Sequence, residues 1–227
     1  MSILQWNING YYAHFEETKL LIKQFNPVAI ALQETKLKPS QCPTVRNYTL
    51  FKKDNPNGLA ACGGVALFVK SAHSPRLLNL QSDLQAVAVQ ITVKNLQITL
   101  CNIYMPPNDK ISFDQFEHVI NQLPSPYLIC GDFNAHNPIW GGQKTNTKGK
   151  LIEKLLFDKN LSLLNGQDYT HFSQSTQSFS TIDLTICSPI LIPQLKWFVH
   201  PDLCSSDHFP IIVTLASDKN RTSGEIK

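Results

Sequence analysis

The chain has 227 residues, of which 42% are hydrophobic and 16% are charged, and its formal net charge at pH 7 is +3. This composition excludes a disordered chain and a coiled coil, and no apolar run approaches the length of a membrane span, so we expect a globular protein without a membrane part. The length permits one or two domains, and the placement of the motifs described below favours one. So small a positive charge does not by itself indicate nucleic-acid binding.

The expected elements alternate between short apolar runs, which predict strands, and segments with apolar residues at every third or fourth position, which predict helices. In chain order they are a strand at about 2–8, a helix at 14–25, strands at 28–33, 63–69, 84–93 and 97–104, a helix at 111–122, a strand at 126–131, a helix at 148–158, and strands at 179–187 and 209–215. Many strands and few helices predict two packed sheets flanked by helices. We expect this domain to occupy residues 1–216, and the polar segment 217–227 to be a flexible tail or the start of a linker to a following domain.

The six cysteines indicate an intracellular protein with reduced thiols. They are scattered without Cys-x-x-Cys spacing, and Cys101 and Cys130 lie inside strand-like runs. No basic segment followed by an apolar one opens the chain, so no secretion signal is expected.

Polar residues stand at the ends of several strand-like runs, where a chain leaving a sheet can hold a side chain at a rigid edge. The segments are 6–10, 31–35, 102–106, 129–136, 180–183 and 205–210. Any one of them can be explained as a turn or a cap. Their occurrence together predicts a functional site built from distant parts of the chain.

These residues have the chemistry needed to hydrolyse a phosphodiester, which requires neutralised phosphate oxygens, an oriented water and a stabilised leaving alkoxide. Glu34 is a hard oxygen ligand suited to Mg²⁺. Asp132 and Asn134 can hold and polarise a water, and His208 can donate a hydrogen bond to a phosphate oxygen if a carboxylate such as Asp183 keeps it protonated. No Gly-x-Ser-x-Gly elbow and no zinc-ligand spacing is present, so a metal-dependent hydrolase with carboxylates is predicted.

The order of these motifs resembles the endonuclease/exonuclease/phosphatase superfamily over residues 3 to about 215. The residues that carry the resemblance are Asn7, Glu34, Tyr104, Gly131-Asp132-Phe133-Asn134, Asp183 and Ser206-Asp207-His208. Within the superfamily, segments 6–10, 63–66, 131–136, 138–141 and 180–184 are similar to the apurinic/apyrimidinic-like endonuclease domain of non-LTR, LINE-type retrotransposons. The resemblance implies an α/β fold of the DNase I type, a four-layer sandwich in which two packed mixed β-sheets are flanked by helices.

The resemblance also implies an activity. It is that of a magnesium-dependent endonuclease, with Mn²⁺ able to substitute, that nicks double-stranded DNA and leaves a 3′-hydroxyl. A covalently linked reverse transcriptase would prime from this hydroxyl during retrotransposition. As an isolated domain the protein would be monomeric, and it would act in the nucleus.

Roles for single residues follow from the same resemblance. At the metal end of the site, Glu34 would bind the ion and Asn7 would support it. Tyr104 would contact the phosphate or the leaving oxygen, and Asp207 would lie near the metal or the water.

At the other end of the site, Asp132 and Asn134 would position the attacking water. Asp183 would pair with His208, which would face the scissile phosphate. Thr170 stands where these retrotransposon enzymes often carry a threonine that contacts phosphate.

Two positions depart from the pattern of the superfamily's repair enzymes. Asn9 stands where they carry an aspartate, which implies looser metal binding. Ser180 stands where they carry a tryptophan that helps form a pocket for an abasic sugar, so intact DNA is the expected substrate. We expect both side chains to face the substrate.

The polar stretch 173–178 lies between two segments with aromatic residues and is typical of the tip of a hairpin. We hypothesise that Gln174, Thr176 and Gln177 at this tip read base edges in a DNA groove. A solvated turn that does not touch DNA is the alternative.

Two other functions fit the same residues. One is a phosphoesterase of the superfamily that acts on abasic DNA or on a small phosphate ester. The other is a DNA-binding module with a decayed active site, although every expected catalytic position is filled. His136 lies beside the site in sequence without an assigned task, and His171 is interpreted as structural because no acidic residue is spaced near it as in a ligand set.

Overall fold

The computed structural model describes residues 1–55, 62–93 and 95–215. The strands are β1 (Ser2–Asn7), β2 (Ala29–Gln33), β3 (Tyr48–Lys53), β4 (Val65–Lys70), β5 (Arg76–Leu78), β6 (Gln85–Val93), β7 (Leu96–Tyr104), β8 (Tyr127–Asp132), β9 (Ser162–Leu163), β10 (His171–Ser173), β11 (Ser178–Ser180), β12 (Asp183–Cys187), β13 (Leu195–Val199) and β14 (Ile211–Leu215). The helices are α1 (Phe15–Phe25), α2 (Phe113–Asn121) and α3 (Thr147–Asp158), with 3₁₀ turns η1 (Ser71–His73), η2 (Pro138–Trp140) and η3 (Pro189–Gln194). The expected tail, 217–227, and its boundary at 216 lie outside the described residues.

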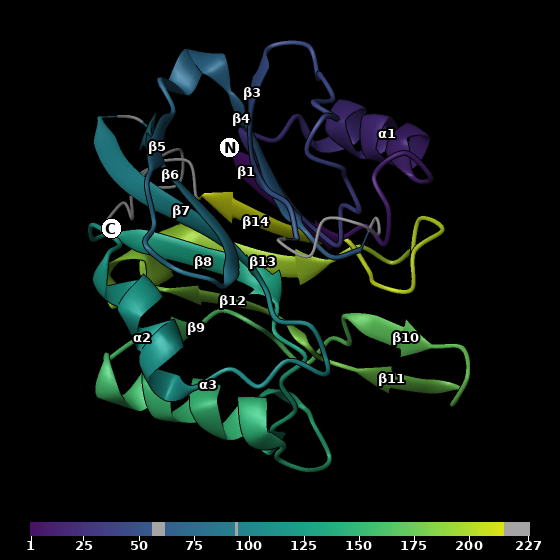
Figure 1. Ribbon diagram of the computed structural model, residues 1–227, viewed down its shortest axis with the longest axis vertical. Coiled ribbons are helices and arrows are strands. Elements are labelled where there is room, and N and C mark those ends of the chain that lie inside the picture. The colour runs from purple at the N-terminus through teal and green to yellow at the C-terminus, as the bar shows by residue number, and fades with distance from the viewer. Residues whose placement is uncertain (56–61, 94, 216–227) are drawn as a thin grey trace, which may run out of the picture.

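Two six-stranded sheets form the centre of the molecule (Figure 1). Their strand orders are β13-β14-β1-β2-β4-β3 and β5-β6-β7-β8-β12-β9. Each sheet contains one parallel pair, β1 with β2 and β7 with β8, among antiparallel neighbours. Strand β14, from the far end of the described chain, pairs with β1, so the first sheet is completed last along the sequence.

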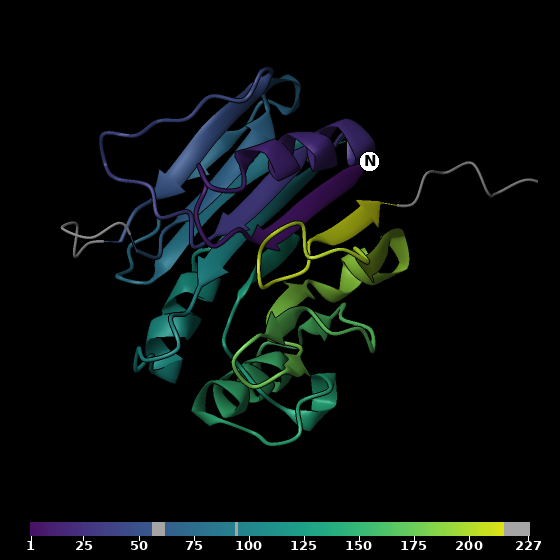
Figure 2. The ribbon, with the colours of Figure 1, turned by 90° about the vertical axis from the view of Figure 1, so that its right-hand side faces the viewer.

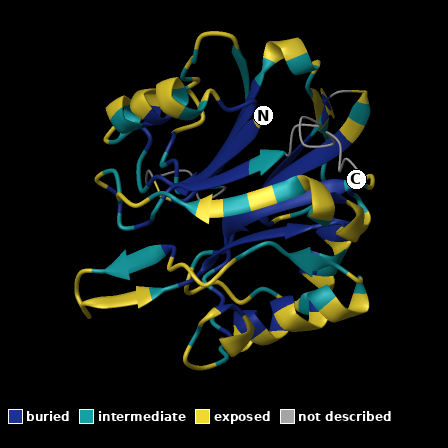
Figure 3. Ribbon diagram, turned by 180° about the vertical axis from the view of Figure 1, so that it is seen from behind, coloured by how far each residue is buried: buried dark blue, intermediate teal, exposed yellow. Residues whose placement is uncertain are grey.

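The space between the sheets is filled by one face of each strand, because successive side chains of a strand point to opposite sides. Ile3 of β1 and Ala31 of β2 pack in this inner cluster against Val87, Leu100 and Leu128 of the second sheet. Figure 3 shows the central strands as the buried part of the molecule. These two apolar faces hold the sheets together.

The outer faces of the sheets are covered by helices (Figure 2). Leu4 and Trp6, on the alternate face of β1, pack with Leu21 of α1. On the other side, Phe116 of α2 and Leu155 of α3 join the outer face of the second sheet in a separate cluster. The order is therefore helix, sheet, sheet, helices, and the predicted four-layer sandwich is confirmed.

Helices α2 and α3 begin where their sequences supply caps. The Ser112 hydroxyl accepts from the amide of Gln115, whose side chain accepts from the amide of Ser112, a capping box. In α3, the side chain of Asn146 accepts from the amide of Gly149 at 2.7 Å. None of the helices within 1–55, 62–93 and 95–215 is long and apolar enough to cross a membrane.

Buried side-chain amides connect the two sheets through the apolar core. Gln5 of β1 donates to the carbonyl oxygens of Gly131 at 3.1 Å and Leu184 at 3.4 Å, both in the second sheet. Asn102 of β7 donates to the carbonyl of Leu32 at 2.8 Å and accepts from the side chain of Gln33 at 2.6 Å. Because unpaired polar groups in such a core are costly, these bonds fix how the sheets lie on each other.

The expected strand at 179–187 is wrong in one respect, because the chain there forms two strands. Residues 178–180 belong to the β10–β11 hairpin, and 183–187 belong to the second sheet. The hydroxyl of Thr170 accepts from the backbone amides of Ile182 and Asp183, both at 3.1 Å. These bonds satisfy the backbone N–H groups where the chain passes from the hairpin to β12. The hairpin leaves the body at this point and projects from it (Figures 1 and 3).

Candidate active site

The candidate catalytic residues lie where strands of both sheets end. Asn7 ends β1 and is paired in register with Gln33, which precedes Glu34. Asp132 ends β8 and is paired with Tyr104 on one side and with Asp183, the first residue of the antiparallel β12, on the other. The two sheets therefore bring distant parts of the sequence to one edge, as the motif positions predicted.

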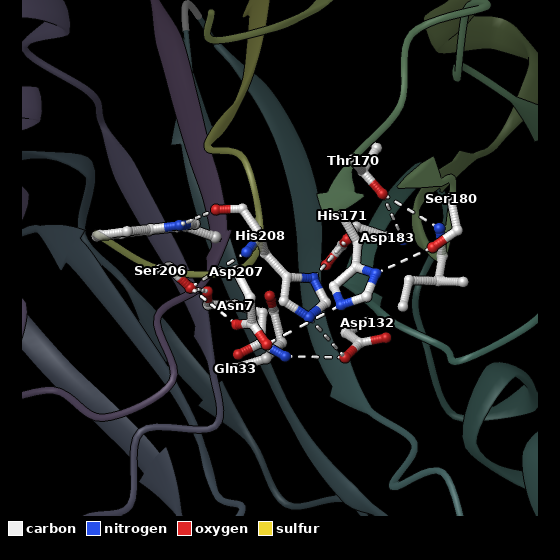
Figure 4. A network of polar contacts seen from close by, with 12 residues as sticks. Asn7, Gln33, Asp132, Thr170, His171, Ser180, Asp183, Ser206, Asp207 and His208 are labelled. Atoms are coloured by element: carbon white, nitrogen blue, oxygen red, sulfur yellow. Dashed lines mark hydrogen bonds and ion pairs between the residues drawn. The ribbon is translucent and has the colours of Figure 1, made fainter. Parts of the chain in front are cut away.

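Asp132 belongs to the polar network in Figure 4. Its side chain is 1% exposed. One carboxylate oxygen accepts from the amide of Asn134 at 2.9 Å. The other accepts from the side chain of Asn7 at 2.8 Å and lies 3.9 Å from Nε2 of His208. Burial, and after it the charge of Asp183, raises the pKa of Asp132 to about 7.

His208 is held on three sides. Its Nδ1 lies 2.8 Å from a carboxylate oxygen of Asp183, and its backbone carbonyl accepts from the indole of Trp6 at 2.8 Å. The Ser206 hydroxyl, which donates to the carbonyl of Asn7, accepts from the His208 amide at 3.3 Å. These contacts leave Nε2 facing the site.

The charge state of His208 follows from its neighbours. Burial lowers the pKa of His208, but the carboxylates of Asp183, Asp132 and Asp207 outweigh that effect and raise it to about 9. The ring is therefore an imidazolium at neutral pH, with Asp183 as its hydrogen-bond partner. Oδ1 of Asp183 is a buried oxygen without a hydrogen-bond partner among the described residues.

Glu34 stands in a left-handed backbone conformation, with φ of 48°. Such a conformation is uncommon outside glycine and aims this carboxylate across the sheet edge. Oε1 accepts from the Tyr104 hydroxyl at 2.7 Å and from the side chain of Asn7 at 3.2 Å. Oε2 faces the ammonium of Lys36 at 4.0 Å, and 23% of the side chain is exposed. Burial, and then the charge of Glu34, raises the pKa of Tyr104, which keeps its hydroxyl protonated.

Asn9 connects Lys36 with Asp207. Its amide nitrogen donates to Asp207 at 3.2 Å, and its side-chain oxygen accepts from the Lys36 ammonium. Lys36 thus brings a positive charge to the position where Asn9 replaces a carboxylate of the repair enzymes. Sequence reasoning did not assign Lys36 to the site. It lies two residues after Glu34, and like Glu34 it has a left-handed backbone conformation.

The donor atoms at this edge fit a hard divalent cation. Glu34 presents a partly exposed carboxylate oxygen, with Asn7 beside it, and Mg²⁺ typically binds one or two protein carboxylates together with waters. Two tight groups of metal-ligand atoms also lie nearby, one formed by Asp132, Asp183 and His208 and the other by His171, Asp207 and His208. Both include His208, whose Nδ1 is bonded to Asp183, so the oxygen donors at Glu34 suit Mg²⁺ better.

Thr170, expected to contact phosphate, is fully buried, and its hydroxyl accepts from the two backbone amides at the start of β12. In this structure it positions Asp183 instead of facing the site. The next residue, His171, does reach the site, since its ring centroid lies 4.5 Å from that of His208. His171 was interpreted as structural, but its ring lies at the site. The carboxylates that flank it come from distant segments of the chain, so spacing along the sequence did not reveal them.

Ser180 lies opposite His171 in the hairpin, and its hydroxyl is 3.0 Å from Nδ1 of that ring. The tip residues Gln174, Thr176 and Gln177 are exposed, as expected of a hairpin tip. Thr176 bonds within the tip to Ser173 and Ser178, at 2.8 and 2.7 Å. The hairpin is confirmed, and contact of its tip with DNA stays a prediction.

Two cavities flank the catalytic residues. One, of about 440 Å³, has Glu34, Lys36 and Tyr104 on its wall. The other, of about 770 Å³, extends from Asn134 and His171 to the hairpin. His136, which had no assigned task, lies on the wall of this second cavity, where burial lowers its pKa. A strand of nucleic acid laid over the catalytic residues would thus have room on both sides.

Residues 98–212, just over half of the chain, match the family described as endonuclease-reverse transcriptase. The chain belongs to this family. It has the fold and the nuclease class of the endonuclease part of that family. The family resemblance inferred from the sequence motifs is therefore confirmed.

Relatives of this chain include longer proteins of mobile elements. It is 24% identical over 218 residues to a probable RNA-directed DNA polymerase from the transposon X-element of Drosophila melanogaster, covering 95% of this chain and 24% of that protein. It is 24% identical over 213 residues to the RNA-directed DNA polymerase from the mobile element jockey of the same species, covering 92% and 23%. The chain thus spans about a quarter of the length of these relatives.

Solved structures share the fold of this family member. The endonuclease domain of TRAS1, a telomere-specific non-LTR retrotransposon, superimposes with a TM-score of 0.79 at 21% identity, covering 96% of this chain and 99% of that one. An AP endonuclease from Archaeoglobus fulgidus gives a TM-score of 0.76 at 18% identity, covering 96% and 100%. The DNase I-like sandwich is therefore shared by a retrotransposon endonuclease domain and an AP endonuclease.

Proposed function

We propose that this domain is a magnesium-dependent endonuclease that nicks double-stranded DNA by hydrolysis and leaves a 3′-hydroxyl. One observation carries the proposal: Glu34, Asp132 and the Asp183–His208 pair, from four distant segments, meet at one edge shared by both sheets. In the reaction, a water oxygen bonds to phosphorus and the water gives up one proton, the P–O3′ bond breaks, and the leaving O3′ takes up one proton.

Asp132 is suited to hold the attacking water. As a carboxylate it accepts a hydrogen bond from that water, while Asn134 fixes one of its oxygens through the backbone amide and Asn7 fixes the other. The side chain of Asn134 also donates to the Met105 carbonyl at 3.1 Å, which fixes the loop after β8. The water would therefore meet preorganised partners.

His208 is suited to stabilise the charge that develops on the phosphate. Its Nε2 faces the site, and the neighbouring carboxylates keep the ring protonated at neutral pH. An imidazolium donor already in place stabilises a more highly charged transition state more than the ground state. Asp183 holds the ring in this orientation through Nδ1.

Glu34 would hold the metal ion, with Asn7 supporting the same site. When bound, Mg²⁺ would neutralise phosphate oxygens and the charge on the leaving oxygen. Tyr104, which donates to Glu34, keeps the other carboxylate oxygen available. Mn²⁺ is expected to substitute because it also prefers oxygen ligands.

The wider context of the domain is part of the same proposal. The match to RNA-directed DNA polymerases of mobile elements supports a covalently linked reverse transcriptase that extends the 3′-hydroxyl at the nick. Because such priming uses chromosomal DNA, the nucleus is the proposed place of action. The isolated domain is proposed to act as a monomer on intact DNA.

A plasmid assay tests this function. With Mg²⁺, the domain should convert supercoiled plasmid to open circles, EDTA should stop the conversion, and a DNA polymerase should extend the nicks without prior removal of a phosphate. His208→Ala should abolish nicking and leave DNA binding largely intact. Conversion of only abasic plasmid or of a small phosphate ester would favour another enzyme of the superfamily, and binding without nicking would favour an inactive module.

A further inference from the structure

His171 is the second histidine at the candidate active site. It is the first residue of β10, and its ring packs on that of His208 with the planes 53° apart. Two backbone bonds fasten this point of the hairpin to the loop that carries His208, from Phe172 to the carbonyl of Asp207 and from Phe209 to the carbonyl of Thr170, both 2.8 Å. The ring therefore has a fixed place beside His208 (Figure 4).

The polar neighbours of His171 favour one tautomer of its ring. Nε2 lies 3.9 Å from a carboxylate oxygen of Asp207, and a carboxylate favours an N–H group facing it. Nδ1 is then left as an acceptor for the Ser180 hydroxyl, 3.0 Å away. Ser180 and His171 are directly opposite in the hairpin, so the hydroxyl is held in place by the strand pairing.

The charge of His171 differs from that of its neighbour. Burial, and after it the positive charge of His208, lowers the pKa of His171. At neutral pH the site thus contains a neutral imidazole next to an imidazolium. A neutral ring with the proton on Nε2 can still donate one hydrogen bond.

His171 also has access to a ligand. Its side chain is 18% exposed and lies on the wall of the 770 Å³ cavity together with Asn134 and Ser180. One nitrogen of each histidine ring and one oxygen of Asp207 lie within 4.8 Å of one another. Two donors this close together can reach oxygens of the same phosphate group.

We propose that His171 binds the scissile phosphate, donating a hydrogen bond from Nε2 to a non-bridging oxygen, and that Ser180 is a positioning residue that fixes the tautomer of its ring. This inference rests on the proposed nuclease function. It gives the base of the hairpin a part in the reaction, separate from any contact its tip makes with bases. Thr170, whose hydroxyl is bonded to backbone amides, leaves the contact with phosphate to its neighbour.

Nicking kinetics of four variants test the proposal. His171→Leu removes the donor, and we expect kcat/KM to fall about 10- to 100-fold, the effect of one hydrogen bond to a charged group. His171→Gln, which places an N–H donor near the position of Nε2, should recover part of this loss. Ser180→Ala should lower kcat/KM less than His171→Leu does, and the double variant should be no slower than His171→Leu alone. His118→Gln, an exposed histidine of α2, is the matched control and should nick as the wild type does.

A substrate with one sulfur at the scissile phosphate, in each of its two configurations, separates contact with phosphate from a structural role. If His171 binds one non-bridging oxygen, the rate ratio between the two configurations should change in His171→Leu and stay as in the wild type in His118→Gln. Thermal melting reports the fold of each variant, and if His171→Leu does not fold, His171→Gln and Ser180→Ala carry the same comparison.

The outcomes separate this inference from the function on which it rests. Wild-type domain that does not nick would remove the proposed function. Wild-type domain that nicks, together with His171→Leu at the same rate or with an unchanged ratio, would overturn the role of His171 alone. Additive losses in the double variant would show that Ser180 does not act through the ring.

Discussion

Single residues of the site carry charges that determine one another's protonation. Asp132, Asp183 and His208 are all buried, and removing one partner would leave the others without compensation. The raised pKa of His208 depends on these carboxylates, with Asp183 contributing most after the opposing effect of burial. The pH dependence of nicking should therefore report the Asp183–His208 pair.

Asp183→Asn should shift the alkaline limit of nicking to lower pH. In the wild type, the rate should fall as the pH rises through about 9, where His208 loses its proton. Without the carboxylate, the pKa of His208 falls, so the decline begins at lower pH, and the maximal rate drops by at least about tenfold. Rates of plasmid nicking from pH 6 to 10 measure both effects. Asp114→Asn, at an exposed position of α2, is the control, and an unmoved limit in Asp183→Asn would contradict the assignment of His208.

Sequence reasoning found the site residues that end strands and missed those that reach the site from elsewhere. Asp132 was predictable because a polar residue at the end of an apolar run is conspicuous. Asp183, inside the expected strand 179–187, was identified by the resemblance of the motif order to the superfamily. Lys36 and His171 were not predictable from the sequence. Loop geometry brings Lys36 to Asn9, and hairpin geometry brings His171 to Ser180 and Asp207. Thr170 was expected to contact phosphate from the family resemblance alone. Its bonds to the amides at the break between β11 and β12 could not be foreseen, because that break has no clear signal in the sequence.

At the scale of elements, the loop after β8 depends on the first turn of α3. The side chain of Asn146 donates to the carbonyl of Asn134 at 2.9 Å and accepts from the amide of His136 at 3.0 Å. Gly149 lets helix and loop approach closely, because a Cβ there would lie 2.0 Å from the His136 carbonyl oxygen. The helix thus holds the loop that positions Asn134.

Gly149→Ala should destabilise the fold, although this exchange within a helix usually stabilises it by about 0.5–1 kcal/mol. The added methyl must push the backbone of His136 away, and we expect the free energy of unfolding to fall by about 1–3 kcal/mol, with slower nicking. Lys150→Ala, exposed on the same helix, should change the stability by less than about 0.5 kcal/mol. Urea unfolding measures both, and a stabilised Gly149→Ala would contradict the close contact.

The tip of the hairpin should affect where the enzyme cuts more than how fast. Changing Gln174, Thr176 and Gln177 together to alanine removes these exposed polar side chains and keeps the base of the hairpin. The distribution of nicks along the DNA sequence should therefore change. Sequencing the nicks on a long mixed-sequence duplex measures it. Gln194→Ala, exposed in η3, should leave the distribution as it is. A tip variant with the wild-type pattern would support a solvated turn.

Long central strands and helices were predicted to within a few residues, whereas the strands at the sheet margins were missed. Strand β3 is half-buried throughout and lacks the alternation of apolar and polar residues that identifies a strand. Strands β5 and β9 have only three and two residues, too few for a pattern to show. Strand β13 does alternate in burial, but Lys196 interrupts its apolar run. Such strands form because a neighbour offers backbone hydrogen bonds, which is information from the fold and not from the local sequence.

For the whole molecule, the site belongs to neither sheet alone. Asn7 and Glu34 come with the first sheet, and Tyr104, Asp132 and Asp183 with the second. A ligand held between them should stabilise the complete fold, because it binds the folded state and not the unfolded chain.

Divalent metal should therefore raise the melting temperature of the domain. At a concentration about 100 times the dissociation constant, Mg²⁺ would add about 2.7 kcal/mol, which corresponds to about 5–10 °C for a domain of this size. Glu34→Gln should abolish most of this shift, whereas Glu16→Gln, at an exposed position of α1, should retain it. Thermal melting with and without the ion measures the difference. An equal shift in Glu34→Gln would place the ion elsewhere.

The pairing of β14 with β1 has a consequence for synthesis on the ribosome. Strand β1 emerges before the other strands of this domain, yet its partner on that side is Ile211–Leu215, and His208 precedes that partner by only a few residues. A nascent chain that has emerged only through β12 lacks both, so its first sheet is open at β1 and its catalytic centre is incomplete. Translation itself thus delays completion of the catalytic site until nearly the whole domain has been made.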